Sequence, residues 1–170
     1  KALVADTSGH VFATYTDGSP GFGLMRFSTG YTPDFQKRIG LNGTLKGAKW
    51  GIDQRMYVEV GSQICVLDAN GNVLKVIQNA PDRYAVYQDH GLAALSFRHD
   101  TAFVVRLDSN LNLRWSKSVK VPPFGLCGFE VTMLEAVAMP GSNDLMVFAN
   151  GKDFCGMGCN GYQRMQFISA

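Results

Sequence analysis

The sequence predicts an all-β fold built from repeated four-stranded units, and three observations support this. First, residues 102–119 alternate apolar and polar side chains on both sides of a polar turn at residues 108–112, as two strands of a hairpin do. Second, Arg106-Leu107-Asp108 follows Val66-Leu67-Asp68 by 40 residues, and that triplet follows Arg26-Phe27-Ser28 by 40. Third, each triplet leads into a turn rich in Gly, Asn, Ser or Thr. A period of about 40 residues with strand-only content is typical of a propeller-type repeat array.

Four repeats are predicted, at about residues 2–40, 48–78, 84–119 and 128–170, and no segment indicates a convincing helix. The expected strands lie in ALVADTSGH, VFATYTDGS, GLMRF and DFQKRI, then KWGID, MYVEV, QICVLD and NVLKVI, then YAVYQ, LAALSF, AFVVRLD and LRWSKSV, and finally EVTMLEAVAM, DLMVFANG and YQRMQFIS. The fourth repeat therefore has three expected strands and an incomplete sheet. In the fourth repeat the corresponding triplet is Phe167-Ile168-Ser169, which lies 61 residues after Arg106-Leu107-Asp108 instead of 40. This spacing indicates an insertion of about 20 residues, chiefly at 140–160.

The composition is that of a globular chain and excludes several classes of partner. Of the 170 residues 46% are hydrophobic, and 16 basic and 14 acidic residues are mixed along the chain to give a net charge of +2. This pattern predicts no nucleic-acid-binding face and no polybasic membrane patch. No apolar run approaches the roughly 18–20 residues that a membrane span needs, so none is expected. The chain starts at Lys1 without a readable targeting segment, so we expect a mature product or a fragment.

Residues 102–119, AFVVRLDSNLNLRWSKSV, resemble the repeats of bacterial-type seven-bladed β-propellers, which share an apolar strand, Leu-Asp, a Gly/Asn turn and Leu-x-Trp-Ser-Lys. Residues 66–77 and 22–39 are weaker copies, with Lys75 and Phe35 in the place of Trp115. The resemblance covers nearly the whole chain and implies a β-propeller, but no particular function. The repeats could close as a small four-bladed ring completed by another segment. We favour consecutive blades of a larger propeller, of roughly six to eight blades.

The four cysteines predict one disulfide and an oxidising compartment. Cys65 lies mid-strand between apolar residues and is expected to be buried. Cys155 and Cys159 lie in the Gly-rich insertion, and Cys127 lies in the preceding connector, so one disulfide among these three is expected. The extracellular space, the cell surface or the periplasm would allow it. A zinc site is the less favoured alternative, because Cys-x-x-x-Cys has no second pair and the histidines are distant in sequence.

No catalytic or cofactor motif is present in the sequence, so neither catalysis nor a cofactor or metal is expected. Gly-x-Ser-x-Gly and His-Glu-x-x-His are both lacking. Asp68-x-Asn70-x-Asn72 resembles the start of a calcium loop but lacks the closing Glu, and a plain β-turn is the better interpretation. The scattered Asp residues, Asp89 among them, fall at expected turns and receive a structural interpretation.

Two sequence features are compatible with a covalently attached or bound glycan. Asn42-Gly43-Thr44 is an N-glycosylation acceptor sequence in a predicted loop between blades. Trp and Tyr side chains could form sugar platforms at the blade edges, but Trp115 is expected to pack between blades instead.

These observations predict a non-catalytic, extracytoplasmic β-propeller that serves as a protein–protein binding or structural assembly module, with a protein partner or neighbouring subunit. The inserted loop is its most individual feature, so partner contacts are expected at Asp153, Phe154, Met157 and Tyr162. A carbohydrate-binding propeller is the first alternative, and it should repeat similar aromatic and polar residues in every blade. A fragment of a cofactor-dependent propeller enzyme is the second, and it should carry repeated charged or metal-binding residues at the ring centre.

Overall fold

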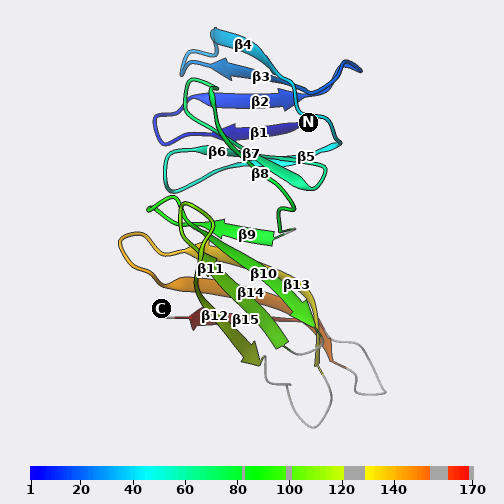
Figure 1. The fold of residues 1–170 in the computed structure, drawn as a ribbon, viewed down its shortest axis with the longest axis vertical. Coiled ribbons are helices and arrows are strands. Elements are labelled where there is room, and N and C mark those ends of the chain that lie inside the picture. Colours follow the sequence, from blue (N-terminus) through cyan, green and yellow to red (C-terminus); the bar gives the residue numbers. More distant parts are fainter. Residues whose placement is uncertain (82, 99–100, 121–128, 154–160, 169–170) are drawn as a thin grey trace. The chain divides into compact units, whose positions relative to one another are not determined.

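The computed structural model describes residues 1–81, 83–98, 101–120, 129–153 and 161–168, and these residues form fifteen strands and no helix (Figure 1). The strands form four antiparallel sheets in which each strand pairs with its neighbour in sequence. Three sheets have four strands and the last has three. The predicted all-β architecture of successive blades, with an incomplete last blade, is confirmed.

The chain folds as two compact units, which we call unit 1 (Lys1–Ala80) and unit 2 (Pro81–Ala170). Each unit contains two blades. Unit 1 consists of blade 1, with β1 (Ala2–Ala5), β2 (Val11–Tyr15), β3 (Phe22–Phe27) and β4 (Pro33–Ile39), and blade 2, with β5 (Leu45–Trp50), β6 (Met56–Val60), β7 (Gln63–Leu67) and β8 (Val73–Ile77). Unit 2 consists of blade 3, with β9 (Arg83–Val86), β10 (Leu92–Arg98), β11 (Thr101–Leu107) and β12 (Leu113–Lys120), and blade 4, with β13 (Phe129–Ala138), β14 (Leu145–Asp153) and β15 (Gly161–Ile168).

Two strand assignments differ from the expectation. The first strand of blade 2 was expected in KWGID but ends at Trp50, because Gly51 N–H donates to Arg55 O at 2.7 Å and closes a turn. In blade 4 part of the extra length lies within regular structure. Strands β13 and β14 have 10 and 9 residues and pair to both ends, so the insertion lengthens a hairpin.

The 40-residue period is visible in the hydrogen-bond register. The pairing between third and fourth strands shifts by one residue between Arg26 and Phe27, between Val66 and Leu67, and between Arg106 and Leu107. Each shift is a β-bulge, which leaves one residue of a strand unpaired and increases the local twist. The repeated bulge bends the sheet at one place in three successive blades, directly before the turn.

Each unit has its own apolar core between its two blades. In unit 1 the Phe12 ring stacks on Trp50 with centroids 5.1 Å apart, and Cys65 is buried, as expected from its apolar neighbours, with burial raising the pKa of its thiol to about 11. In unit 2 Trp115 packs against the core, as predicted. The buried members are Phe12, Phe22, Leu24, Ile39, Met56, Val58, Val60, Cys65 and Leu67 in unit 1, and Ala85, Tyr87, Ala93, Leu95, Ala102, Val104, Ala138, Leu145 and Val147 in unit 2.

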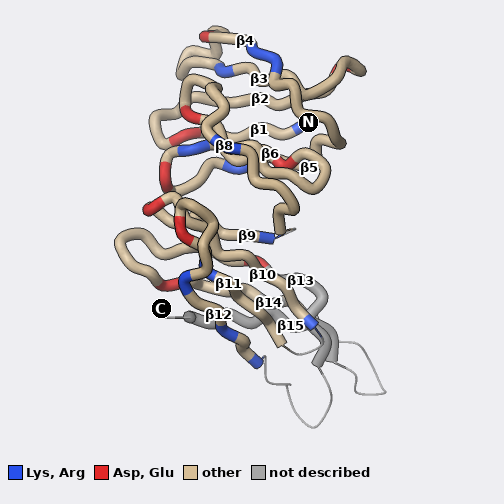
Figure 2. The backbone as a smooth tube through the Cα atoms, viewed as in Figure 1, with Lys and Arg blue, Asp and Glu red and all other residues tan. Residues whose placement is uncertain are grey.

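Charged residues are spread over both units (Figure 2), which agrees with the even charge pattern of the sequence. In the part of the chain that the structure describes, no helix is long and apolar enough to cross a bilayer.

Candidate functional site

The candidate site is the end of each sheet where the turn between the first and second strands meets the turn between the third and fourth. Successive antiparallel strands place these two turns at the same end, and we call this end the turn edge of the blade (Figure 1). The turns comprise residues 6–10 and 28–32 in blade 1, 51–55 and 68–72 in blade 2, 87–91 and 108–112 in blade 3, and 139–144 in blade 4.

Six of these turns share one hydrogen-bond pattern. The first residue donates its N–H to the carbonyl of the fifth, and the fourth donates to the carbonyl of the first. In the 68–72 turn both distances are 3.0 Å, and in the 108–112 turn both are 2.9 Å. The fourth residue usually adopts a positive φ, which costs little for Gly71 but strains Tyr31 (φ 59°) and Leu111 (φ 68°).

In several of these turns the carboxylate of the first residue accepts hydrogen bonds from the backbone of the same turn. Asp68 Oδ1 accepts from the N–H groups of Asn70 and Asn72, both at 2.8 Å, and Asp68 Oδ2 accepts from Asn72 Nδ2 at 2.8 Å. Asp108 makes the same three contacts at 2.8–3.2 Å. The Asp-x-Asn-x-Asn segment therefore uses its carboxylate to hold its own backbone, which supports the turn interpretation over a calcium loop.

These caps lower the pKa of the carboxyl groups. At Asp68 burial opposes ionisation, but the hydrogen bonds from Asn72 and Asn70 outweigh it, so the pKa lies below its ordinary value. At Asp108 the backbone hydrogen bond from Asn112 is the main cause of a lowered pKa. Asp6 has the same geometry, with His10 replacing the Asn at 2.8 Å from Oδ2, and burial is again outweighed by hydrogen bonds.

In unit 1 the turn edges of the two blades are joined by side chains. Thr7 Oγ1 donates to Gln54 Oε1 at 2.7 Å and so links the first turns of blades 1 and 2. Arg26 Nη1 donates to Ala69 O at 2.8 Å, and Lys37 Nζ donates to the carbonyl of Asn70 at 2.7 Å. These bonds connect residues 33 to 47 positions apart in sequence and fix the turns relative to each other.

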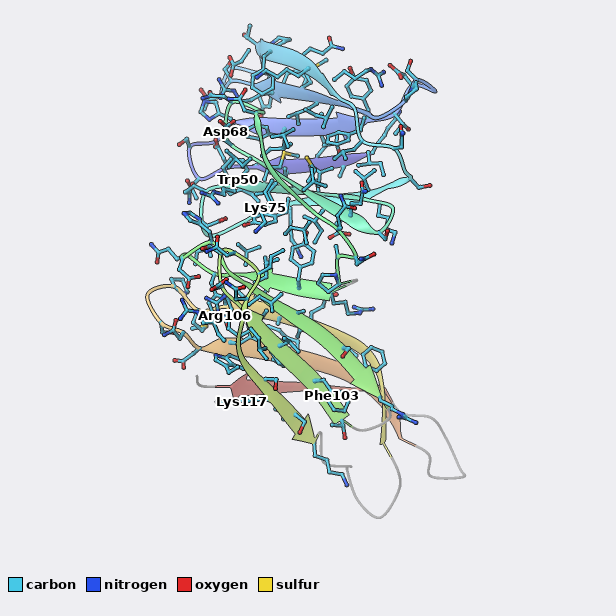
Figure 3. The ribbon with its side chains drawn as sticks, in the orientation of Figure 1. Trp50, Asp68, Lys75, Phe103, Arg106 and Lys117 are labelled. Carbon is cyan, nitrogen blue, oxygen red and sulfur yellow. The ribbon has the colours of Figure 1, made fainter. Side chains whose placement is uncertain are left out.

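Arg26 also donates to Asp34 Oδ2 of its own blade at 2.9 Å. In unit 2 the equivalent arginine bonds a side chain of its own blade. Arg106, labelled in Figure 3, is 4% exposed and lies 80 residues after Arg26. It donates through Nη2 to both carboxylate oxygens of Asp89 at 2.7 Å. Its guanidinium carbon lies 3.7 Å from the centroid of the Tyr87 ring, a cation–π contact. Burial opposes the charged form of Asp89, but the Arg106 and Gly91 hydrogen bonds outweigh it and lower the pKa. A β-carbon on Gly91 would meet the Arg106 guanidinium and Leu107 O, so only glycine fits beneath this ion pair.

A polar pocket of about 410 Å³ lies in unit 2 between the first turns of blades 3 and 4. It is lined by Tyr87, Gln88, Asp89, Gly141, Ser142 and Asn143. The Tyr87 hydroxyl is buried and has no hydrogen-bond partner among the described residues. Burial raises the pKa of this hydroxyl, so the phenol stays protonated. A buried polar group without a partner costs stability.

A second pocket in unit 2, of about 400 Å³, is more apolar and lies along β9, β10 and β11. It is lined by Pro81, Arg83, Ala94, Leu95, Ser96, Phe97 and Val105. Arg83 is held by Glu135 at 2.8 Å.

The residues predicted from sequence as partner or disulfide positions lie mainly elsewhere. Asp153 is the last residue of β14 and Tyr162 the second of β15, so these two belong to strands by their backbone. Asn42 is exposed between β4 and β5. Five predicted residues, Phe154, Met157, Cys127, Cys155 and Cys159, lie outside the described residues, and the disulfide, glycosylation and partner assignments stay predictions.

Sequence reasoning did not find the Tyr87, Asp89 and Arg106 cluster, since it gave Asp89 only a turn role. One signal was available. Arg106 shares the face of β11 with the buried residues Ala102 and Val104, and a charge on the apolar face of a strand requires a partner. Within the described residues, no three His, Cys, Asp or Glu side chains gather as potential metal ligands.

No protein-family model matches the chain, and no curated protein matches it. Several solved structures are similar in fold. The tail fiber of Staphylococcus aureus phage P68 matches with a TM-score of 0.53 and 10% identity over 99% of this chain and 50% of that chain. A protein of unknown function from Bacteroides caccae matches with 0.50 and 13% over 99% and 60%, and a Lactobacillus plantarum protein with 0.50 and 13% over 99% and 55%.

At these identities the likeness concerns the fold alone. The chain spans 50–60% of the length of these three chains. Together with the four successive antiparallel sheets, the likeness defines a partial β-propeller, made of three complete blades and three strands of a fourth.

Proposed function

We propose that this chain is a non-catalytic part of a larger β-propeller that acts outside the cytoplasm as a protein–protein binding or assembly module. The observation that carries the proposal is the turn edge of unit 1. Its turns are capped internally and joined by the Thr7–Gln54, Arg26–Ala69 and Lys37–Asn70 hydrogen bonds. Such a surface loses little conformational entropy when a partner binds, which favours affinity.

Tyr31 is the proposed anchor on this surface. It occupies the fourth position of the 28–32 turn, and its side chain is 80% exposed. Its positive φ of 59° is unfavourable for a non-glycine residue. Tyrosine is among the residues most enriched at the energetic centres of protein interfaces. The strained, exposed aromatic side chain therefore fits a partner contact better than a structural role.

Replacing Tyr31 by glycine tests this assignment without threatening the fold, because glycine adopts a positive φ readily. We expect Tyr31→Gly to lose the partner in crosslinking and mass spectrometry of extracytoplasmic material from the source organism. Leu111→Gly is the matched control, since Leu111 has the same turn position in blade 3 with φ 68°. Equal partner recovery by both variants would remove Tyr31 from the proposal.

The predicted loop contact remains a second proposed surface. Substituting Phe154 and Met157 by serine should weaken partner recovery if that segment contributes, and Tyr31→Gly tells the two surfaces apart. The proposed compartment rests on a disulfide among Cys127, Cys155 and Cys159. Intact mass before and after reduction and alkylation should reveal one disulfide, whereas four free thiols would contradict an oxidising compartment.

Carbohydrate binding is the second candidate function. The observation in its favour is the polar pocket of unit 2, which lies at a turn edge and carries hydrogen-bonding side chains.

A further inference from the structure

The pocket of unit 2 lies between the two turns that correspond to those joined by a hydrogen bond in unit 1. In unit 1 the first turns of the two blades, residues 6–10 and 51–55, are linked by Thr7 and Gln54 at 2.7 Å. In unit 2 the corresponding turns, residues 87–91 and 139–144, flank a space of about 410 Å³. This volume lies within the range of about 300–1,000 Å³ found for small-molecule sites.

The pocket is lined by the carboxylate of an ion pair whose positive partner, Arg106, is buried behind it. Asp89 is 58% exposed at its side chain, whereas Arg106 is 4% exposed. The carboxylate therefore presents its remaining lone pairs to the pocket, while the buried guanidinium neutralises its charge. An anionic ligand is disfavoured by the carboxylate, and a free cation gains little because the charge is already compensated.

Polar groups that both donate and accept line the same pocket as this carboxylate. Ser142 Oγ accepts from the N–H of Asp144 at 3.1 Å, which leaves its O–H to donate. Gln88 and Asn143 carry amides that offer both donors and an acceptor, and both side chains are exposed.

We propose that this pocket binds a neutral polyhydroxylated ligand of saccharide type, with Asp89 accepting hydrogen bonds from ligand hydroxyls and Ser142 and Asn143 completing the site. A hydroxyl group donates and accepts at once, so it matches a mixed set of carboxylate, hydroxyl and amide groups without bringing charge. Arg106 is a positioning residue, because it orients Asp89 and is itself almost inaccessible. The inference deepens the second candidate function and does not depend on the protein partner proposed at Tyr31.

Backbone amide NMR of the native chain, titrated with glucose, galactose and N-acetylglucosamine, tests the proposal. Inorganic phosphate and calcium chloride serve as charged comparison probes. We expect saccharide-dependent shifts at Gly91, Ser142 and Asn143, at the walls of the pocket, and much smaller responses to phosphate and calcium.

Two variants probe the site by different means. Asn143→Leu replaces the exposed amide by an apolar side chain of similar size, and Asp89→Asn keeps the shape of the side chain but removes the charged acceptor. Asp89→Asn should weaken saccharide binding at least about tenfold, the effect of losing a hydrogen bond to a charged group, and Asn143→Leu should weaken it about fivefold, the effect of losing a neutral one. Ser8→Ala is the matched control, because Ser8 holds the turn position of Asp89 in blade 1, and it should bind as the native chain does.

Several results would overturn the proposal. These are the absence of shifts with all three sugars, preferential binding of phosphate or calcium, and unchanged saccharide binding by Asn143→Leu. Unchanged binding by Asp89→Asn alone would overturn the role given to the carboxylate. The amide spectrum of each variant reports whether it is folded, so a loss of binding is separable from unfolding. Loss of the partner in Tyr31→Gly is independent of all these outcomes.

Discussion

Units 1 and 2 are each built from two antiparallel sheets of consecutive strands, but within each unit the turn edges of the two blades are connected differently. In unit 1 Arg26 reaches the neighbouring blade at Ala69 O, and Thr7 reaches Gln54. In unit 2 Arg106 pairs with Asp89 of its own blade, and a pocket remains between the first turns. The blade fold thus fixes where the turns lie, while a few side chains decide whether neighbouring turns are joined or leave a site.

The cores of the two units also differ next to these arginines. Phe12 pairs in register with Arg26, and Ala93 pairs with Arg106, so the two positions correspond. Phe12 stacks on Trp50 in unit 1, whereas the corresponding Ala93 of unit 2 is a small buried residue. Both arginines lie over an aromatic ring, but Arg106 lies closer to Tyr87, at 3.7 Å, than Arg26 lies to Phe35, at 5.1 Å.

The largest expected effect is on the core of unit 1. Phe12→Ala should lower the free energy of unfolding by about 3–5 kcal/mol, because it empties a fully buried site and unstacks Trp50. Chemical denaturation measures the loss, and hydrogen exchange along the chain should place the weakened protection in unit 1. Leu3→Ala, at a side chain 73% exposed, should change stability by less than about 0.5 kcal/mol. Equal effects of the two variants would contradict the assigned core.

The next largest effect on stability is expected from a substitution that disturbs the Arg106–Asp89 ion pair of unit 2. Gly91→Ala should cost about 1–3 kcal/mol, because its β-carbon would overlap the Arg106 guanidinium and press on a backbone carbonyl. Gly40→Ala is the control, since nothing lies within 4 Å of a β-carbon there. A denaturation midpoint that is unchanged in Gly91→Ala would show that Arg106 does not need the close approach. The same variant should also disturb saccharide binding through Asp89.

A smaller effect should appear in acid. The pKa values of Asp6, Asp68, Asp89 and Asp108 are lowered in the folded chain, below the ordinary value of 3.8. The unfolded chain therefore binds protons first, so the stabilisation is present above the ordinary pKa and is lost as the pH falls through the folded values. Urea midpoints should fall between about pH 5 and pH 2.

Asp68→Asn should flatten this acid dependence while lowering stability near neutral pH. Both units contribute caps of this kind, so the pH dependence should concern the whole chain. Midpoints that do not change in acid would contradict the role of the caps.

The smallest effect on stability is expected from removing the Thr7–Gln54 hydrogen bond, which joins the first turns of the two blades in unit 1. Thr7→Val removes the donor to Gln54 and should cost less than about 1 kcal/mol, because the bond is exposed to water. Thr29→Val, at an exposed residue of the neighbouring turn, serves as the control. Slower or unchanged hydrogen exchange at the two unit 1 turns in Thr7→Val would show that the bond does not fix them.

Much of the fold could be predicted because it depends on local pattern. The strands follow the two-residue alternation, and the repeated triplets coincide with the bulges at Arg26, Val66 and Arg106. Asp68 and Asp108 were correctly interpreted as turn residues, since the carboxylate bonds backbone groups two and four positions away. The first strand of blade 2 was expected in KWGID but lies earlier, at Leu45–Trp50, and the turn after it begins at Gly51, a residue type that does signal turns.

The sequence by itself determined the all-β class, the 40-residue period and the capped turns, because these arise from interactions between residues a few positions apart. Only the tertiary structure decided that Arg106 pairs with Asp89 rather than with the next blade, and that Thr7 meets Gln54 47 residues away. Those contacts depend on how whole sheets pack and which side chains fill the space between them. The joined turn edge of unit 1 and the polar pocket of unit 2 are both products of that packing.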